Sequence, residues 1–142
     1  MHMFKRAVMV MSLLLVAAGA WAADFVIIVN SDNKVSSLSA KDVSALFLKK
    51  KTQWSNGTKV VPVVLNDEAS ATAAFDKQIL NRSAAAVHAY WQQEIFSGRS
   101  VPPAEKAADD EVVAFVQKNP GAIGYISATA AHSGVNVVKV TE

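Results

Sequence analysis

Cysteine is absent from all 142 residues of the sequence. No disulfide can stabilise the fold, and no thiol can act as a nucleophile or a metal ligand. Histidine is scarce, with three residues, and His88 has no second ligand at a metal-binding spacing, so we interpret it as structural. A Gly-x-Ser-x-Gly motif, a Walker loop and an HExxH motif are also missing. We therefore predict a protein that is not an enzyme and that uses no metal or other cofactor.

The sequence also lacks an excess of positive or negative charge once Lys5 and Arg6 are set aside. The full sequence has 14 basic and 12 acidic residues, which gives a formal net charge of +2. Lys5 and Arg6 account for this excess, because without them 12 basic residues face 12 acidic ones. A nucleic-acid-binding protein needs a basic surface, so the composition argues against nucleic acid as a partner.

The first 22 residues have the three-part pattern of a secretory signal peptide. Lys5 and Arg6 precede an apolar run over residues 7–18, and residues 20–22 (Ala-Trp-Ala) fit a cleavage site with small residues. We expect cleavage after this motif, which leaves a periplasmic domain over residues 23–142. An uncleaved membrane anchor is the alternative, although the apolar run is short for a transmembrane helix.

The most informative stretch covers residues 60–80, VVPVVLNDEASATAAFDKQIL. Its first six residues are almost continuously apolar and β-branched, which predicts a buried strand. Pro62 places this strand near a sheet edge or marks its start, because proline cannot donate to the ladder. A polar elbow follows, and Ser70 is the predicted N-cap of a helix that begins at Ala71.

A helix that begins directly after a strand directs its free N–H groups and its positive dipole end into the crevice where α/β folds bind ligands. Ser70 and Thr72 add hydroxyl donors, so the chemistry of this elbow suits a small oxyanion. The alternative is that Ser70 only caps the helix. The end of the first strand joins the elbow if the two strands are parallel neighbours.

The rest of the mature chain mostly alternates strands and helices. Strands are predicted at residues 25–29, 60–65, 122–126 and 135–140, and helices after Ser39, after Ser70, over 84–96 after Ser83, and after Asp109 or Asp110; one further helical turn is expected at 127–131. Residues 98–108 are predicted to form a loop, and Gly124 indicates a close backbone approach or a bulge. Together these elements predict one small α/β domain with a mixed or mostly parallel sheet flanked by helices.

Several motifs occur in an order and rough spacing that resemble the phosphate-binding proteins of ABC transporters. They are residues 38–43 (LSAKDV) with Leu46-Phe47, Trp54, Gly57, Pro62-Val63, Ser70-Ala71-Thr72 with Phe75, Tyr90-Trp91, and residues 119–125 (NPGAIGY). The resemblance covers nearly all of the mature chain. It implies one lobe of a type II periplasmic binding protein that binds inorganic phosphate or a related oxyanion and is linked to an ABC permease, to transport or to sensing. The site it implies contains Ser70, Ala71, Thr72, Ala73, Asn30 and Ser31.

The sequence departs from the family pattern in two respects. Full-length members have two lobes, whereas the 120 residues after position 22 resemble one. The family elbow reads Ser-Gly-Thr with an arginine nearby, but here Ala71 replaces the glycine, and Arg82 and Arg99 lie outside the elbow. The loss of a bidentate cation should weaken anion binding by roughly 1.5–3 kcal/mol.

Two hypotheses about function therefore remain. In the first, the domain is a periplasmic anion-binding module. In the second, the lobe has lost its ligand and acts as an interaction domain with an envelope protein, or as a homodimer that rebuilds the missing half. Trp54, Trp91 and Pro102-Pro103 are then candidate contact residues, although burial in the core is the alternative for Trp91.

Overall fold

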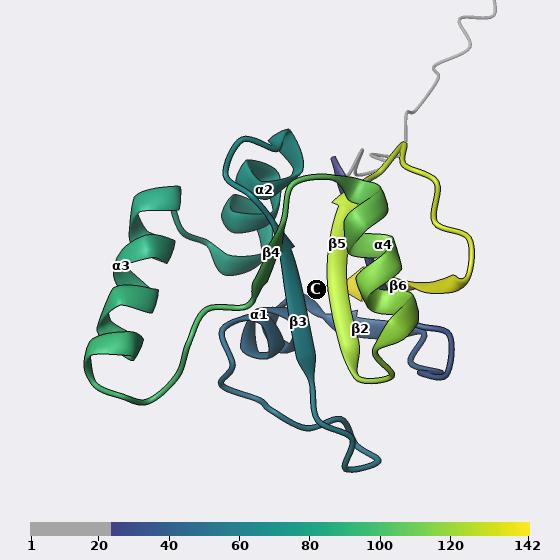
Figure 1. Cartoon of the computed structure of the whole chain (residues 1–142), viewed down its shortest axis with the longest axis horizontal. Coiled ribbons are helices and arrows are strands. Elements are labelled where there is room, and N and C mark those ends of the chain that lie inside the picture. Colours follow the sequence, from purple (N-terminus) through teal and green to yellow (C-terminus); the bar gives the residue numbers. More distant parts are fainter. Residues whose placement is uncertain (1–23) are drawn as a thin grey trace, which may run out of the picture.

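The computed structural model describes residues 24–142, so the predicted signal peptide lies outside the described residues. Figure 1 shows an α/β domain with its elements labelled in chain order. They are β1 (Phe25–Asn30), β2 (Ser37–Ser39), α1 (Ala40–Phe47), β3 (Val61–Leu65), α2 (Ser70–Phe75), a π-helical segment (Asp76–Leu80), α3 (Ala84–Phe96), β4 (Ala104–Lys106), α4 (Asp109–Lys118), β5 (Ala122–Ser127) and β6 (Val135–Thr141).

The six strands form one mixed sheet in the order β2-β6-β1-β5-β3-β4. β3 is parallel to both β4 and β5, and β2 is parallel to β6, whereas β1 is antiparallel to β5 and β6. The prediction of a mixed sheet is confirmed. Pro62 is the second residue of β3, and pairing with β4 begins only at Val63, so the proline lies where the strand starts and has one neighbour.

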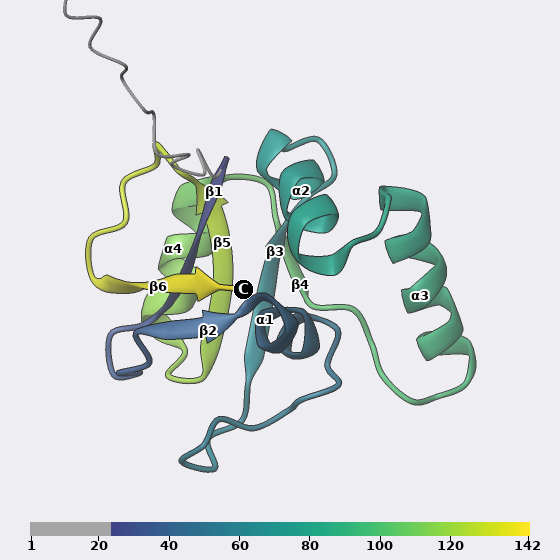
Figure 2. The same cartoon turned by 180° about the vertical axis from the view of Figure 1, so that it is seen from behind.

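Helices cover both faces of the sheet. α4 packs on one face against β5, β1 and β3, while α1 and α2 lie on the other, as the two opposite views of Figures 1 and 2 show. Gly124 permits the packing of α4 against β5. A Cβ atom at this position would come within 2.8 Å of Val63 Cγ1 and 2.9 Å of Val112 Cγ1. The predicted close approach at Gly124 is therefore confirmed, and it joins β5 to β3 and α4.

The core on the α1 and α2 face is built from aromatic rings. Phe75 and Tyr125 stack with ring centroids 4.1 Å apart, and the edge of Phe47 meets Phe75 at 4.7 Å. Phe25 closes the cluster at 5.6 Å from Phe75. All four side chains are buried. Phe75 thereby anchors α2 to the sheet five residues after the helix begins.

α3 stands apart from the other helices, at one side of the molecule in Figures 1 and 2. Trp91 is its one buried residue. The Tyr90 hydroxyl donates a 2.8 Å hydrogen bond to the carbonyl of Leu48, which ties the helix to the end of α1. α3 therefore lies against the domain through a few side chains rather than through a continuous face.

Several local predictions are confirmed. Ser39 and Ser83 cap α1 and α3, with side-chain oxygens that accept hydrogen bonds from the N–H groups of Asp42 and Ala86. Trp54 is buried, and its indole N–H donates to the carbonyl of Gly121. It is a packing residue, and so is the buried Trp91.

Other local predictions are wrong. Asp109 does not cap α4, because Ala108 is the N-cap and Asp109 instead accepts a hydrogen bond from the N–H of Ser127. The three-residue strands β2 and β4 were not predicted, and residues 128–130 form a turn rather than a helical turn. Within residues 24–142, no helix has both the length and the hydropathy needed to span a bilayer.

Candidate functional site

The predicted elbow lies at the carboxyl edge of the three parallel strands. β3, β5 and β4 all end at this edge, and the N–H of Asn66, just beyond β3, donates to the carbonyl of Lys106, the last residue of β4. After Leu65 the chain makes one turn and enters α2 at Ser70. The N-terminal N–H groups of α2 therefore face the edge where α/β sheets bind ligands.

Thr72 fixes the conformation of the elbow. Its buried hydroxyl donates to the carbonyl of Asn66 at 2.7 Å and lies 3.2 Å from the carbonyl of Leu65. The Tyr125 hydroxyl donates to Thr72 Oγ1 at 3.1 Å, and burial raises the pKa of this phenol. Thr72 thus joins β3, α2 and β5, and its hydroxyl is engaged within the protein.

The other residues of the predicted elbow site differ in their exposure. Ser70 and Ala73 are exposed, whereas Ala71 is buried. Ser70 is the first residue of α2 rather than its cap, because Ala69 is the N-cap and makes no side-chain hydrogen bond. The capping prediction for Ser70 is therefore wrong, and this correction leaves its hydroxyl at the exposed first turn.

Asn30 and Ser31 do not join the elbow. β1 is antiparallel to β5 and β5 is parallel to β3, so β1 ends at the opposite edge of the sheet. There the Asn30 amide donates to the carbonyls of Val116 and Gln117 at the end of α4, and its oxygen accepts from the N–H of Asp32. The prediction that the first strand contributes to the elbow site is wrong, and Asn30 has a structural role.

The charges beside the elbow are mostly negative. Asp67 and Glu68 are exposed in the turn before α2. Asp67 Oδ2 lies 2.6 Å from Nε2 of His88 on α3, so this histidine bridges α3 to the elbow. The arginines lie elsewhere: Arg82 precedes α3 and packs on the Tyr90 ring, and Arg99 follows the helix.

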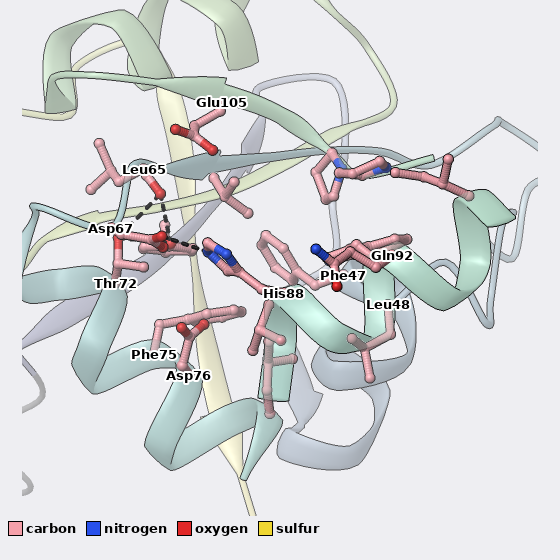
Figure 3. Close-up of a pocket in the computed structure, with 18 residues that line it drawn as sticks. Phe47, Leu48, Leu65, Asp67, Thr72, Phe75, Asp76, His88, Gln92 and Glu105 are labelled. Carbon is pink, nitrogen blue, oxygen red and sulfur yellow. Dashed lines mark hydrogen bonds and ion pairs between the residues drawn. The ribbon is translucent and has the colours of Figure 1, made fainter. Parts of the chain in front are cut away.

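A pocket of about 280 Å³ opens between α3 and the elbow (Figure 3). Thr72 and Tyr125 reach it from the core, and Asp67, His88 and Asp76 line it beside aromatic and aliphatic side chains. Within residues 24–142, no group of three His, Asp or Glu side chains has a geometry that could hold a metal ion.

Asp76 is the residue of this pocket that sequence reasoning missed. Its side chain is only 6% exposed. Burial, and then the nearby Asp67, raise the pKa of this carboxyl to about 6, while His88 acts in the opposite direction. A signal was present in the sequence, because Asp76 follows the buried Phe75 directly and lies three residues before the buried Ile79.

A family model described as a PBP superfamily domain matches residues 16–141 of this chain. A search of curated protein sequences gave no match.

The chain is also similar to solved structures. One, from Clostridium perfringens, is described as a phosphate ABC transporter substrate-binding protein with bound phosphate; its TM-score is 0.64 and its identity 23%, with 82% of this chain and 44% of that chain covered. The match to an ABC-type phosphate transport receptor from Vibrio cholerae has a TM-score of 0.65 at 16% identity, and it covers 82% of this chain and 46% of that chain. PstS from Borrelia burgdorferi has a TM-score of 0.64 at 12% identity, with 84% and 47% covered. The chain thus shares their fold and spans less than half the length of each.

Proposed function

We propose, because this chain belongs to the PBP superfamily domain family, that it is a periplasmic module that binds phosphate or a related oxyanion at the start of α2. In this proposal residues 1–22 form a signal peptide, residues 23–142 form the binding domain, and the role is recognition for phosphate transport or sensing rather than catalysis. An ABC permease is the corresponding partner.

One observation carries the proposal: α2 begins at the carboxyl edge of parallel strands. The turn before it is held by the Thr72 hydroxyl, which bonds the carbonyl of Asn66. A turn fixed in this way presents the first N–H groups of α2 in a constant direction, and Ser70 adds an exposed hydroxyl. The N–H of Thr72 already donates to the carbonyl of Ala69 at 3.1 Å. The donors that we assign to the anion are therefore the backbone N–H groups of Ser70, Ala71 and Ala73 and the Ser70 hydroxyl.

The composition of the elbow limits the affinity that we expect. No arginine lies in the turn, and the carboxylates of Asp67 and Glu68 are exposed there. Charge-assisted hydrogen bonds are roughly twice as strong as neutral ones, so a site built from N–H groups alone should bind weakly. We expect dissociation constants in the millimolar range, about −4 kcal/mol.

Ser70→Pro tests the proposal directly. Proline is well tolerated at the first helical position, and Ala69 already has the extended conformation that a following proline requires, with φ −73° and ψ 131°. The variant should keep the fold while losing one N–H group and the hydroxyl. Ala84→Pro is the matched control, because it occupies the same position of α3 after the cap Ser83.

The measurement is a thermal-melt series with phosphate, sulfate and chloride at matched ionic strength. A ligand at a hundred times its dissociation constant stabilises by about 2.7 kcal/mol, which is a shift on the order of 5–15 °C for a domain of this size. We expect a shift selective for phosphate or sulfate in the parent and in Ala84→Pro, and a much smaller one in Ser70→Pro. An equal shift in Ser70→Pro, or no selective shift in the parent, would refute the proposal.

A second candidate function is an interaction domain that pairs with another copy of the chain. It is favoured by apolar side chains exposed at the end of α3 and just beyond it: Ile95 at 53%, Phe96 at 90% and Val101 at 61%. Because the chain spans less than half of its structural relatives, a second copy would restore their size. Sedimentation should then show a dimer that Phe96→Ser dissociates, and a monomeric parent would rule this candidate out.

A further inference from the structure

The pocket between α3 and the elbow has an apolar wall with four aromatic side chains, Phe47, Phe75, Trp91 and Tyr125. Phe75 contributes to this wall from α2 (Figure 3), and Val87, Trp91 and Ile95 contribute to it from α3. A volume of about 280 Å³ is close to the lower end of the ~300–1,000 Å³ range of small-molecule sites. The pocket therefore has room for a small organic molecule with one apolar group.

The charged groups of this pocket are predominantly acidic. Carboxylates reach it from three places: Asp67 from the elbow, Asp76 from the start of the π-helical segment and Glu105 from β4. His88 is the one basic side chain that lines it, and this imidazole is already paired with Asp67 at 2.6 Å. No lysine or arginine is among the described residues that line the pocket, so its field attracts a cation.

Asp76 is the group that makes this acidic surface a site. It is only 6% exposed, and within residues 24–142 its side chain has no hydrogen bond or ion pair. Among these residues no side-chain oxygen is both fully buried and unpartnered, so the Asp76 carboxylate oxygens remain in contact with solvent. Buried carboxylates are normally paired, because leaving one unpaired has a large desolvation cost. Figure 3 shows its carboxylate beside Phe75, and both Asp76 and His88 line the pocket.

The surroundings of Asp76 also indicate which way it faces. Asp67 and His88, the charged groups that shift its pKa, both line this pocket. Lys77 and Arg82 line a shallower hollow that Asp76 also borders, but neither forms an ion pair with it. The unpaired carboxylate is therefore available to a partner that enters between α2 and α3.

We propose that this pocket binds a small organic cation, a protonated amine with a short apolar group, whose ammonium pairs with Asp76 while the apolar part lies between Phe75 and Trp91. A metal ion is a poor fit, since the described acidic and histidine side chains do not converge to a metal-binding geometry. This site adjoins the first turn of α2, where we place the oxyanion, because Thr72 borders the pocket, but the cation pairs with Asp76 rather than with the N–H groups of that turn.

Isothermal titration with benzylammonium chloride, compared with benzyl alcohol as the uncharged analogue, tests this assignment. The parent protein should bind benzylammonium in a 1:1 ratio at pH 7 and benzyl alcohol at least tenfold more weakly, because the alcohol lacks the charge that pairs with Asp76. Asp76→Asn should weaken benzylammonium binding at least tenfold. Asp110→Asn, an exposed carboxylate on α4, is the matched control and should leave binding unchanged.

The pH dependence provides a further readout. Because the pKa of Asp76 is raised to about 6, affinity for benzylammonium should fall roughly tenfold between pH 7 and pH 5 in the parent, and not in Asp76→Asn. Equal binding of benzyl alcohol, parent-like binding by Asp76→Asn, or no binding at about 10 mM benzylammonium would each overturn the assignment. If Asp76→Asn fails to fold, Glu105→Gln is tested in its place. Parent-like affinity of Glu105→Gln for benzylammonium would then overturn the assignment.

Discussion

α2 and the π-helical segment that continues it contain two buried polar side chains that differ in their hydrogen bonding. Thr72 is buried and fully engaged, with its hydroxyl between the carbonyl of Asn66 and the hydroxyl of Tyr125. Asp76, one helical turn later, is buried without a partner. The first should stabilise the fold and the second should oppose it, and each expectation can be measured.

Thr72→Val should destabilise the protein by about 1–3 kcal/mol, because it keeps the shape but leaves the carbonyl of Asn66 without its donor. Thr72→Ser retains the hydroxyl and should be destabilised clearly less than Thr72→Val. Urea denaturation of the three proteins gives the comparison. If Thr72→Val were as stable as the parent, the elbow would be held by its backbone alone, and Thr72 would not be its anchor.

Asp76→Asn should raise the free energy of unfolding at pH 7, on the order of 1–3 kcal/mol. The folded pKa of about 6 lies above the ordinary value of 3.8, so between these values the folded protein holds a proton that the unfolded chain releases. The parent should therefore gain stability as the pH falls from about 6 to 4, and lose it again as the pH rises.

The advantage of Asp76→Asn over the parent should accordingly shrink across this window and be smallest below about pH 4. Denaturation at a series of pH values measures it, with Asp110→Asn as the control because that side chain is exposed. A constant difference between Asp76→Asn and parent at all pH values would show that Asp76 is not the titrating group.

At the scale of elements, the structure separates a tightly packed sheet from a loosely attached α3. β5 is buried over five of its six residues, whereas α3 has one buried residue, Trp91. Regions with few buried contacts open at lower free energy than the core. α3 should thus be the first helix to detach.

Trp91→Ala should increase amide hydrogen exchange throughout α3 by at least tenfold while leaving β5 unchanged, because the substitution removes the main buried contact of that helix. Gln93→Ala, at an exposed position of the same helix, is the control. Hydrogen exchange followed by mass spectrometry resolves the two elements. Parallel loss of protection in α3 and β5 would instead mean that the helix and the sheet unfold as one unit.

The elements also show what a sequence can and cannot predict. The caps Ser39 and Ser83 and the strand at Val61–Leu65 depend on neighbours a few residues away, and they were predictable. The close approach at Gly124 was predictable from a glycine inside a strand, although the residues that make it, Val63 and Val112, are distant in sequence. The direction of β1 was not, because it depends on which later strand pairs with it. That single reversal removed Asn30 and Ser31 from the predicted site.

At the scale of the whole molecule, motif resemblance was a better guide than residue chemistry. The spaced motifs predicted the family and a one-lobe fold, and both are confirmed. The pocket under α3 was beyond reach, because it arises where α2, α3 and β4 meet through side chains far apart in sequence. Tertiary contacts of this kind leave no local pattern.

The described residues, 24–142, form one α/β domain in which α2 begins at the carboxyl edge of parallel strands. Phosphate at saturating concentration should consequently leave the radius of gyration unchanged in small-angle X-ray scattering, since binding at the first turn of α2 requires no hinge motion. The forward scattering, which reports the molecular mass, shows whether one copy or two copies bind the anion. A doubled mass that appears only with phosphate would mean that two copies enclose the anion between their α2 edges, and that Ser70 lies at a shared interface. An unchanged mass and radius, together with a phosphate-selective thermal shift, would establish an open site on a single copy. The affinity of such a site is limited because solvent is not excluded from the bound anion.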